Sequence, residues 1–215
     1  MSVYTFAQKT QTKTVSEVID TYFQAIGGKE KALQIDTFSS ISIGTLNSRE
    51  IQLEKKLMLP NLYYTAMKSE DQILSTSVFN GKKGKTTQGS SEQKMGRNET
   101  KTLKKGRSIF PEFNYYHTAK YRGIQKASNE DCHVLEIGNS RIFYSTKTGL
   151  KVKGTSTQEK DDELFIQHLY FSNYVEIEGL LFPSCLVLEV GTSKIEFLTR
   201  SLSLNTDVTE KDFDL

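Results

Sequence analysis

The sequence predicts an α+β protein built on a curved antiparallel sheet of roughly ten strands, a half-open β-barrel, with an N-terminal helix packed on the concave face. One strongly amphipathic helix lies near the N-terminus, and almost all of the chain after it reads as short strands separated by turns. A sheet of about ten strands curls toward a barrel. The apolar stripe of the helix must be buried, and a face of that sheet is the available partner.

The clearest element is a helix that we expect to run from residue 15 to residue 26. Thr14 is the expected N-cap, and Glu17 completes a capping box because its side chain can reach back to the cap. Gly27 and Gly28 end the helix, since glycine readily adopts the left-handed conformation that closes a last turn. A short second helix is expected at 29–33. The apolar positions of the first helix follow helical spacing: Val15, Val18, Ile19, Tyr22, Phe23 and Ile26.

The rest of the chain alternates between strand patterns and turn residues, which predicts an antiparallel meander. The best alternation is at 49–59, which places Ile51, Leu53, Lys55, Leu57 and Leu59 on one face. Residues 209–213 predict a closing helical turn. The expected strands are 38–44, 49–59, 62–68, 73–79, 84–88, 121–127, 131–137, 141–145, 150–158, 164–175, 181–190 and 194–204.

The composition is that of an ordinary soluble globular protein, with 215 residues of which 36% are hydrophobic and 25% charged. No apolar run approaches the ~20 residues of a membrane span, so no transmembrane segment is expected. We expect one domain at 14–215 after a flexible N-terminus at 1–13. Residues 4–7 resemble the end of a secretory signal peptide, which predicts an exported protein of the periplasm or cell envelope.

A basic stretch runs from Lys82 to Arg107, with nine basic residues, two acidic residues and a formal charge of +7. It has little to bury, so we expect a solvated helix at 92–105 or a mobile flap near the mouth of the sheet. The stretch is either a solvated face or a site for anionic lipid headgroups or an envelope protein. Nucleic acid is not expected, because no binding motif accompanies the charge and no aromatic residues are interleaved with it.

Signatures of catalysis and metal binding are absent from the sequence. The three histidines are far apart, and neither a hydrolase elbow nor a phosphate-binding loop occurs. We therefore expect no catalytic residue, no metal, no cofactor and no enzymatic activity. The two cysteines, Cys132 and Cys185, do not form a CxxC motif. They either pair with each other or remain as free thiols buried in strands.

Several segments, in order along the chain, resemble bacterial envelope proteins of the LolA/LolB-like lipoprotein-carrier superfamily. They are YFQAIGGKEK at 22–31, LPN at 59–61, VFNGKKG at 78–84, YSTKTGL at 144–150, YVEIEGLLFP at 174–183 and the closing segment at 204–213. The same module also resembles the C-terminal accessory domain of some exported insulinase-type peptidases.

The resemblance implies a half-open antiparallel barrel with helices over its mouth and an apolar cavity that receives acyl chains. It predicts a non-catalytic carrier that binds lipid or the acyl chains of lipoproteins. The alternative is a non-enzymatic accessory or protein-interaction domain of a larger envelope protein or peptidase, whose concave face is simply its core.

Nine residues are the predicted ligand-binding set, because helical spacing and strand alternation allow them one common face. If the cavity is instead filled, the same residues form an ordinary core. The set is Tyr22, Phe23, Leu53, Leu57, Tyr64, Phe79, Tyr144, Leu186 and Leu188.

Overall fold

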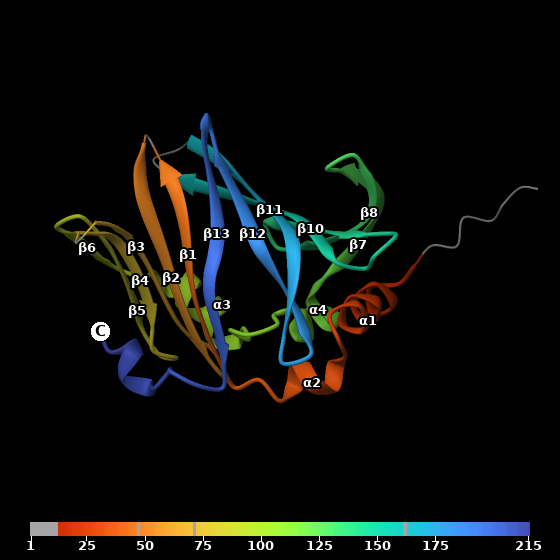
Figure 1. The fold of residues 1–215 in the computed structure, drawn as a ribbon, viewed down its shortest axis with the longest axis horizontal. Helices are drawn as coiled ribbons and strands as arrows, with labels where there is room; N and C mark the ends of the chain where they lie inside the picture. Colours follow the sequence, from red (N-terminus) through yellow and green to blue (C-terminus); the bar gives the residue numbers. More distant parts are fainter. Residues whose placement is uncertain (1–12, 47, 71, 161–162) are drawn as a thin grey trace, which may run out of the picture.

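The protein folds into one large curved antiparallel sheet of 13 strands that does not close, with a few helices (Figure 1). The structure, a computed structural model, describes residues 13–46, 48–70, 72–160 and 163–215. The helices are α1 (Val15–Ala25), α2 (Lys29–Leu33), α3 (Arg97–Lys105), α4 (Glu112–Thr118) and the 3-10 helix η1 (Glu210–Phe213). The strands are β1 (Thr37–Leu46), β2 (Arg49–Met58), β3 (Leu62–Ser69), β4 (Gln72–Phe79), β5 (Gly84–Gln88), β6 (Ser91–Lys94), β7 (Lys120–Ala127), β8 (Glu130–Ile137), β9 (Ser140–Ser145), β10 (Lys151–Lys160), β11 (Glu163–Ile177), β12 (Leu180–Val190) and β13 (Ser193–Leu204).

The sheet consists of two meanders that are joined at one place. Strands β1 to β6 pair in sequence order, as do β7 to β13, and β1 pairs with β13 to connect them. This junction runs antiparallel from Phe38 opposite Leu204 to Gly44 opposite Phe197. All pairings are antiparallel, as the turn-separated strand pattern predicted.

Helix α1 forms as its sequence signals predicted. The hydroxyl of Thr14 accepts a hydrogen bond from the backbone N–H of Glu17, and the Glu17 carboxylate accepts one from the backbone of Thr14. Gly27 and Gly28 follow with φ of 116° and 117°. A Cβ on Gly27 would lie 2.2 Å from the carbonyl oxygen of Gly179 in the β11–β12 turn, so only glycine lets the helix end approach this turn.

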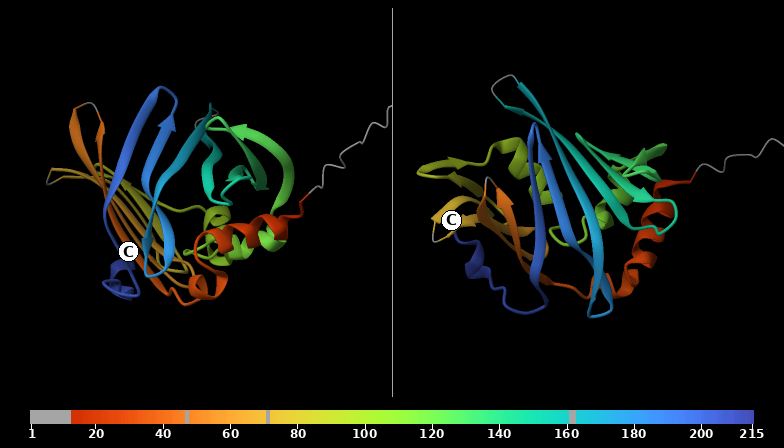
Figure 2. Two further views of the ribbon diagram at one scale, coloured as in Figure 1. Left: turned by 45° about the vertical axis from the view of Figure 1, so that its right-hand side comes forward. Right: turned by 45° about the horizontal axis from the view of Figure 1, so that its top comes forward.

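The main core lies between α1 and the concave face of the sheet. Val18, Ile19, Tyr22 and Phe23 of α1 are buried in one cluster with residues from across the sheet, including Leu57 on β2 and Leu135 on β8. Strands β2 and β8 are separated by six other strands, which would hold them about 34 Å apart in a flat sheet. Because both reach the same cluster, the sheet must curl around the helices, as the two views in Figure 2 show.

The region 90–107 contains the expected solvated helix, but its first part forms a strand instead. Ser91–Lys94 forms strand β6, which pairs with β5 through a turn at Gly89, where φ is 57°. The helix expected at 92–105 is shorter and runs only over α3, because Gly96 occupies its N-cap in an extended conformation. The expected start of the helix at residue 92 was therefore wrong, whereas a solvated helix that ends at Lys105 is present and has no buried residue.

Helix α4 was not predicted, since its residues read only as an aromatic cluster around Pro111. Pro111 occupies the N-cap position, where its missing N–H has no consequence, and the aromatic side chains pack against α1. Tyr116 of α4 accepts a hydrogen bond from Lys29 and donates one to Asp20, which ties α4 to α1 and α2. The three helices α1, α2 and α4 are gathered to one side of the molecule in Figure 1.

The remaining expectations concern the ends, the thiols and membrane spans. The predicted flexible N-terminus at 1–13 lies outside the described residues except for Lys13. The closing turn is the helix η1, capped by Thr209 and anchored by the buried Phe213. Cys132 and Cys185 are free thiols, both buried. In the part of the chain that the structure describes, no helix combines the length and apolar character needed to cross a membrane.

Candidate functional site

A cavity of about 200 Å³ lies on the concave face of the sheet, beneath the segment that leads into α4. Its floor is formed by β1, β2 and β11 to β13, and one side is closed by α1 and residues 108–111. Most of its lining is aromatic or aliphatic. These residues are Tyr22, Phe38, Leu57, Ile109, Phe110, Pro111, Leu169, Phe171, Leu181, Phe182, Pro183, Leu186 and Leu202.

Aromatic rings form one wall of the cavity. The ring centroid of Phe182 lies 5.8 Å from that of Phe38 and 5.9 Å from that of Phe110. Phe110 lies on the segment before α4, and this segment is fastened to the sheet by Ser108. The Ser108 backbone N–H donates to the Pro60 carbonyl at 3.1 Å, and its hydroxyl donates to the Met58 carbonyl at 2.8 Å. Aromatic contacts with Phe182 and the hydrogen bonds of Ser108 therefore fix the segment before α4 on the sheet.

Six polar residues complete the lining: Ser40, Ser42, Lys55, Ser108, Lys151 and Thr199. The two lysines have different surroundings. Lys151 forms an ion pair with Glu112 of α4 at 2.9 Å, whereas Lys55 forms no ion pair with any side chain that the structure describes. The cavity thus combines an apolar lining with one positive charge that lacks a partner.

Glu112 and Lys151 form a buried ion pair next to the cavity. The Glu112 side chain is 1% exposed, and its Oε1 also accepts a hydrogen bond from the Tyr144 hydroxyl at 3.4 Å. Burial lowers the pKa of Lys151, but the Glu112 carboxylate, together with Tyr174 and Tyr115, more than offsets this effect and raises the pKa above its ordinary value. Burial, with the nearby Glu112 charge, raises the pKa of Tyr22 and Tyr144 well above the usual value, so both hydroxyls stay neutral.

The concave face continues beyond the apolar cavity as a groove of about 690 Å³ with a largely polar lining. A small apolar cluster around Ile51, Ile195 and Phe197 packs against Leu53 and Met67, which line this groove. The groove is lined by Leu53, Thr65, Met67, Ser75, Thr76, Ser77, Thr86, Thr87, Gln88, Ser91, Gln93 and Gln167. One face of the sheet therefore carries an apolar region and a polar region end to end.

Three of the nine predicted site residues line the cavity: Tyr22, Leu57 and Leu186. Phe23 and Tyr144 lie behind it in the same core cluster, where Tyr22 and Tyr144 pack edge to face at 5.4 Å. The structure therefore brings these five residues together around one apolar region.

The other four lie elsewhere on the sheet. Leu53 and Leu188 pack against the apolar cluster around Phe197, and Leu53 also lines the polar groove. Phe79 is buried and stacks on Tyr63 at 6.1 Å. Tyr64 faces the opposite side of the sheet, because it pairs with Lys56 while its neighbour Tyr63 pairs with Leu57. The prediction of one common face was wrong for Tyr64.

Sequence reasoning missed Lys55, Phe110, Phe182 and the Glu112–Lys151 pair as parts of the site. A signal existed for Lys55, since alternation placed it on the apolar face of its strand between Leu53 and Leu57. No local signal existed for Phe182 or for the pairing of Glu112 with Lys151. Both depend on contacts between segments that are far apart in the chain, and alternation within one strand contains no information about such contacts.

Solved structures share this fold, among them those of two proteins. One is a LolA superfamily protein from Nitrosomonas europaea, with a TM-score of 0.57 at 12% identity over 94% of this chain and 99% of that chain. The other is a DUF1329 family protein from Desulfovibrio piger, with a TM-score of 0.53 at 11% identity over 94% of this chain and 98% of that chain. No protein-family model matches the sequence, and no curated protein sequence does. At these identities the likeness concerns the fold alone.

Proposed function

We propose that this protein, which has a LolA-like fold, is a non-catalytic carrier that binds a lipid, or the acyl chains of a lipoprotein, in the apolar cavity. The observation that carries the proposal is the lining of that cavity, which consists mainly of aromatic and aliphatic side chains on the concave face. An apolar concave site selects apolar ligands.

The energetics of such binding require no reacting group. Burial of an acyl chain gains about 0.8 kcal/mol for each methylene removed from water, so a cavity alone is sufficient for a useful carrier. The motifs that resemble envelope lipoprotein carriers support a place in the cell envelope, and we propose the periplasm.

A substitution that fills the cavity tests this function. In Ser40→Phe the new ring should occupy the cavity, so binding of a neutral apolar dye such as 1-N-phenylnaphthylamine should fall at least about tenfold. Ser39→Phe is the matched control, because Ser39 pairs with Lys56 on the opposite face of the same strand and should bind dye as the wild type does. Dye fluorescence measures binding, and circular dichroism checks that both variants are folded.

The same experiment distinguishes the alternative function. If a folded wild type binds no dye and no acyl ligand, the carrier is excluded. The concave face is then the core of an accessory or protein-interaction domain. Equal loss of binding in Ser39→Phe and Ser40→Phe would also contradict a site in this cavity.

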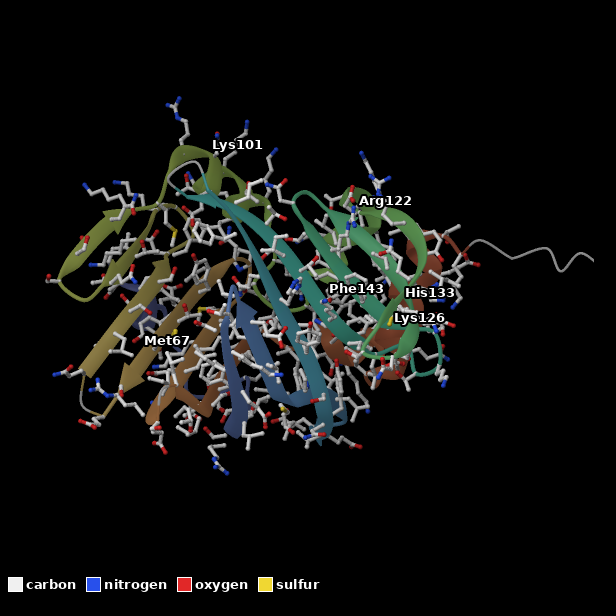
Figure 3. The ribbon with its side chains drawn as sticks, turned by 90° about the horizontal axis from the view of Figure 1, so that it is seen from above. Met67, Lys101, Arg122, Lys126, His133 and Phe143 are labelled. Carbon is white, nitrogen blue, oxygen red and sulfur yellow. The ribbon has the colours of Figure 1, made fainter. Side chains whose placement is uncertain are left out.

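The basic stretch from 82 to 107 supports a second element of the proposal, contact with anionic headgroups or with an envelope protein. Lys101, Lys104 and Lys105 are exposed on α3, and Figure 3 shows Lys101 at the outer edge of the molecule. The backbone carbonyls of Leu103 and Lys104 accept hydrogen bonds from Asn61, which holds α3 next to the segment that covers the cavity.

We expect the protein to bind vesicles that contain anionic lipid, with an affinity that falls steeply as salt is raised. Changing Lys101, Lys104 and Lys105 together to glutamine should remove about 1 kcal/mol of binding for each lysine. The distant triple change of Arg122, Lys126 and Lys153 to glutamine is the control for net charge. Cosedimentation with vesicles measures both variants. Binding that does not respond to salt would leave the stretch as a solvated face.

A further inference from the structure

We propose that the cavity takes a single-chain amphiphile with an anionic head, such as a fatty acid, and that Lys55 binds the head group. This inference depends on the acyl-chain binding proposed above and adds the chemical class of the ligand. Three observations support it: the charge inside the cavity, the position of Lys55 along the concave face, and the size of the apolar space.

The charges that line the cavity do not balance. Two lysines line it, and no acidic residue is among the described residues that do. The charge of Lys151 is matched by Glu112, whose carboxylate lies 2.9 Å away. Lys55 has no such partner among the side chains that the structure describes. An ammonium group beside apolar side chains is stabilised by an anion, so an anionic ligand group would complete this site.

The surroundings of Lys55 leave its charged form poorly stabilised. Desolvation of its ammonium group lowers the pKa of Lys55 below the ordinary value, and the ammonium of Lys151 lowers it further. The Lys55 residue nevertheless keeps contact with solvent. Lys55 is therefore accessible to an incoming ligand. A negative charge on that ligand would stabilise the ammonium form of Lys55 and raise its pKa.

Lys55 stands where the apolar region meets the polar region. On β2, Leu57 lines the apolar cavity and Leu53 lines the polar groove, and Lys55 lies between them on the same face. Ser40 is its neighbour on β1, and Thr65 is its neighbour on β3. An amphiphile with its head at Lys55 places its chain against Leu57, Phe38 and Phe182, while the head faces the hydroxyl groups.

The size of the cavity favours one chain. Its volume of about 200 Å³ lies below the 300–1,000 Å³ of sites for drug-sized ligands, whereas a lipid with two or three chains needs more space. The ligand class that satisfies both the size and the charge is a single alkyl chain with one anionic group.

The test compares two ligands that differ only in the head group, dodecanoate and dodecanol, by displacement of the neutral dye. The wild type should bind dodecanoate about tenfold more tightly than dodecanol, as a charge-assisted hydrogen bond predicts. In Lys55→Met, which keeps the length of the side chain, the ratio of the two affinities should fall to about one. Lys55→Arg should keep the preference. Lys126→Met, which removes an exposed charge on β7, is the control.

The outcomes separate this inference from the proposed function. If dodecanol and dodecanoate bind equally to the wild type, the head group is not recognised and the inference is wrong, although acyl-chain binding stands. If neither ligand binds, both the inference and the proposed function are wrong. The comparison in the wild type does not depend on whether Lys55→Met folds. An equal loss of dodecanoate preference in Lys126→Met would also overturn the role of Lys55.

Discussion

Replacing Phe23 by alanine is expected to lower the free energy of unfolding by about 3–5 kcal/mol. Phe23 is 1% exposed, and its ring centroid lies 4.4 Å from that of Phe113 and 6.3 Å from that of Phe110. The change removes these contacts and leaves a cavity between α1 and α4. Since the aromatic wall of the ligand cavity includes Phe110, packing of the segment before α4 should loosen as well.

The matched control is Phe165→Ala. Phe165 lies on β11 and is 40% exposed, so its loss should change stability by no more than about 0.5 kcal/mol. Urea denaturation measures both variants, and the two denaturation slopes should agree with that of the wild type. Similar stability of Phe23→Ala and Phe165→Ala would mean that α1 does not anchor the core.

Breaking the Glu112–Lys151 pair should destabilise the fold by about 3–5 kcal/mol from either side. In Glu112→Gln the ammonium of Lys151 stays inside the protein without its counter-ion. In Lys151→Met the Glu112 carboxylate, which is 1% exposed, becomes a buried charge without a counter-ion. Its Oε1 keeps the hydrogen bond from Tyr144, and its Oε2 has no hydrogen-bond partner among the described residues. A combined Glu112→Gln, Lys151→Met variant leaves no unpaired charge, so it should lose less stability than the two single changes together.

A double-mutant cycle from urea denaturation measures this coupling, which should reach about 0.5–3 kcal/mol. The control is the pair of the exposed Lys194 with the half-buried Glu189, at 3.3 Å, and Lys194→Met should change stability by no more than about 1 kcal/mol. Additive losses in the Glu112–Lys151 cycle would show that the two charges do not stabilise each other.

The elements that local patterns define were predictable from the sequence. Helix α1 and its caps follow from Thr14, Glu17 and the two glycines, because these contacts involve residues close in the chain. Alternation predicted the strands except β6. The four residues of β6 are all exposed, so apolar and polar residues do not alternate there. Helix α4 was missed because its aromatic residues pack on α1, which is a contact across more than 80 residues of chain.

The site was only partly predictable because alternation does not determine register. Alternation shows which residues of one strand share a face. It does not show how that strand pairs with its neighbour, so it cannot decide whether the apolar residues of two strands lie on the same face of the sheet. Tyr64 illustrates this limit. Its neighbour Tyr63 pairs with Leu57, so Tyr64 lies on the opposite face of the sheet from Leu57. Lys55 illustrates the opposite case, because alternation within its own strand is enough to place this charged residue between Leu53 and Leu57 on an apolar face.

The junction of the two meanders also determines when the fold can be completed. Strand β1 ends at Leu46, but its partner β13 ends only at Leu204, so the pairing depends on almost the last residues to be synthesised. At about 5–20 residues per second, a ribosome needs about 10–30 s to make the intervening chain. Throughout that time the meander β1 to β6 has an open edge at β1. Because this central contact spans most of the chain, its high contact order also predicts slow folding.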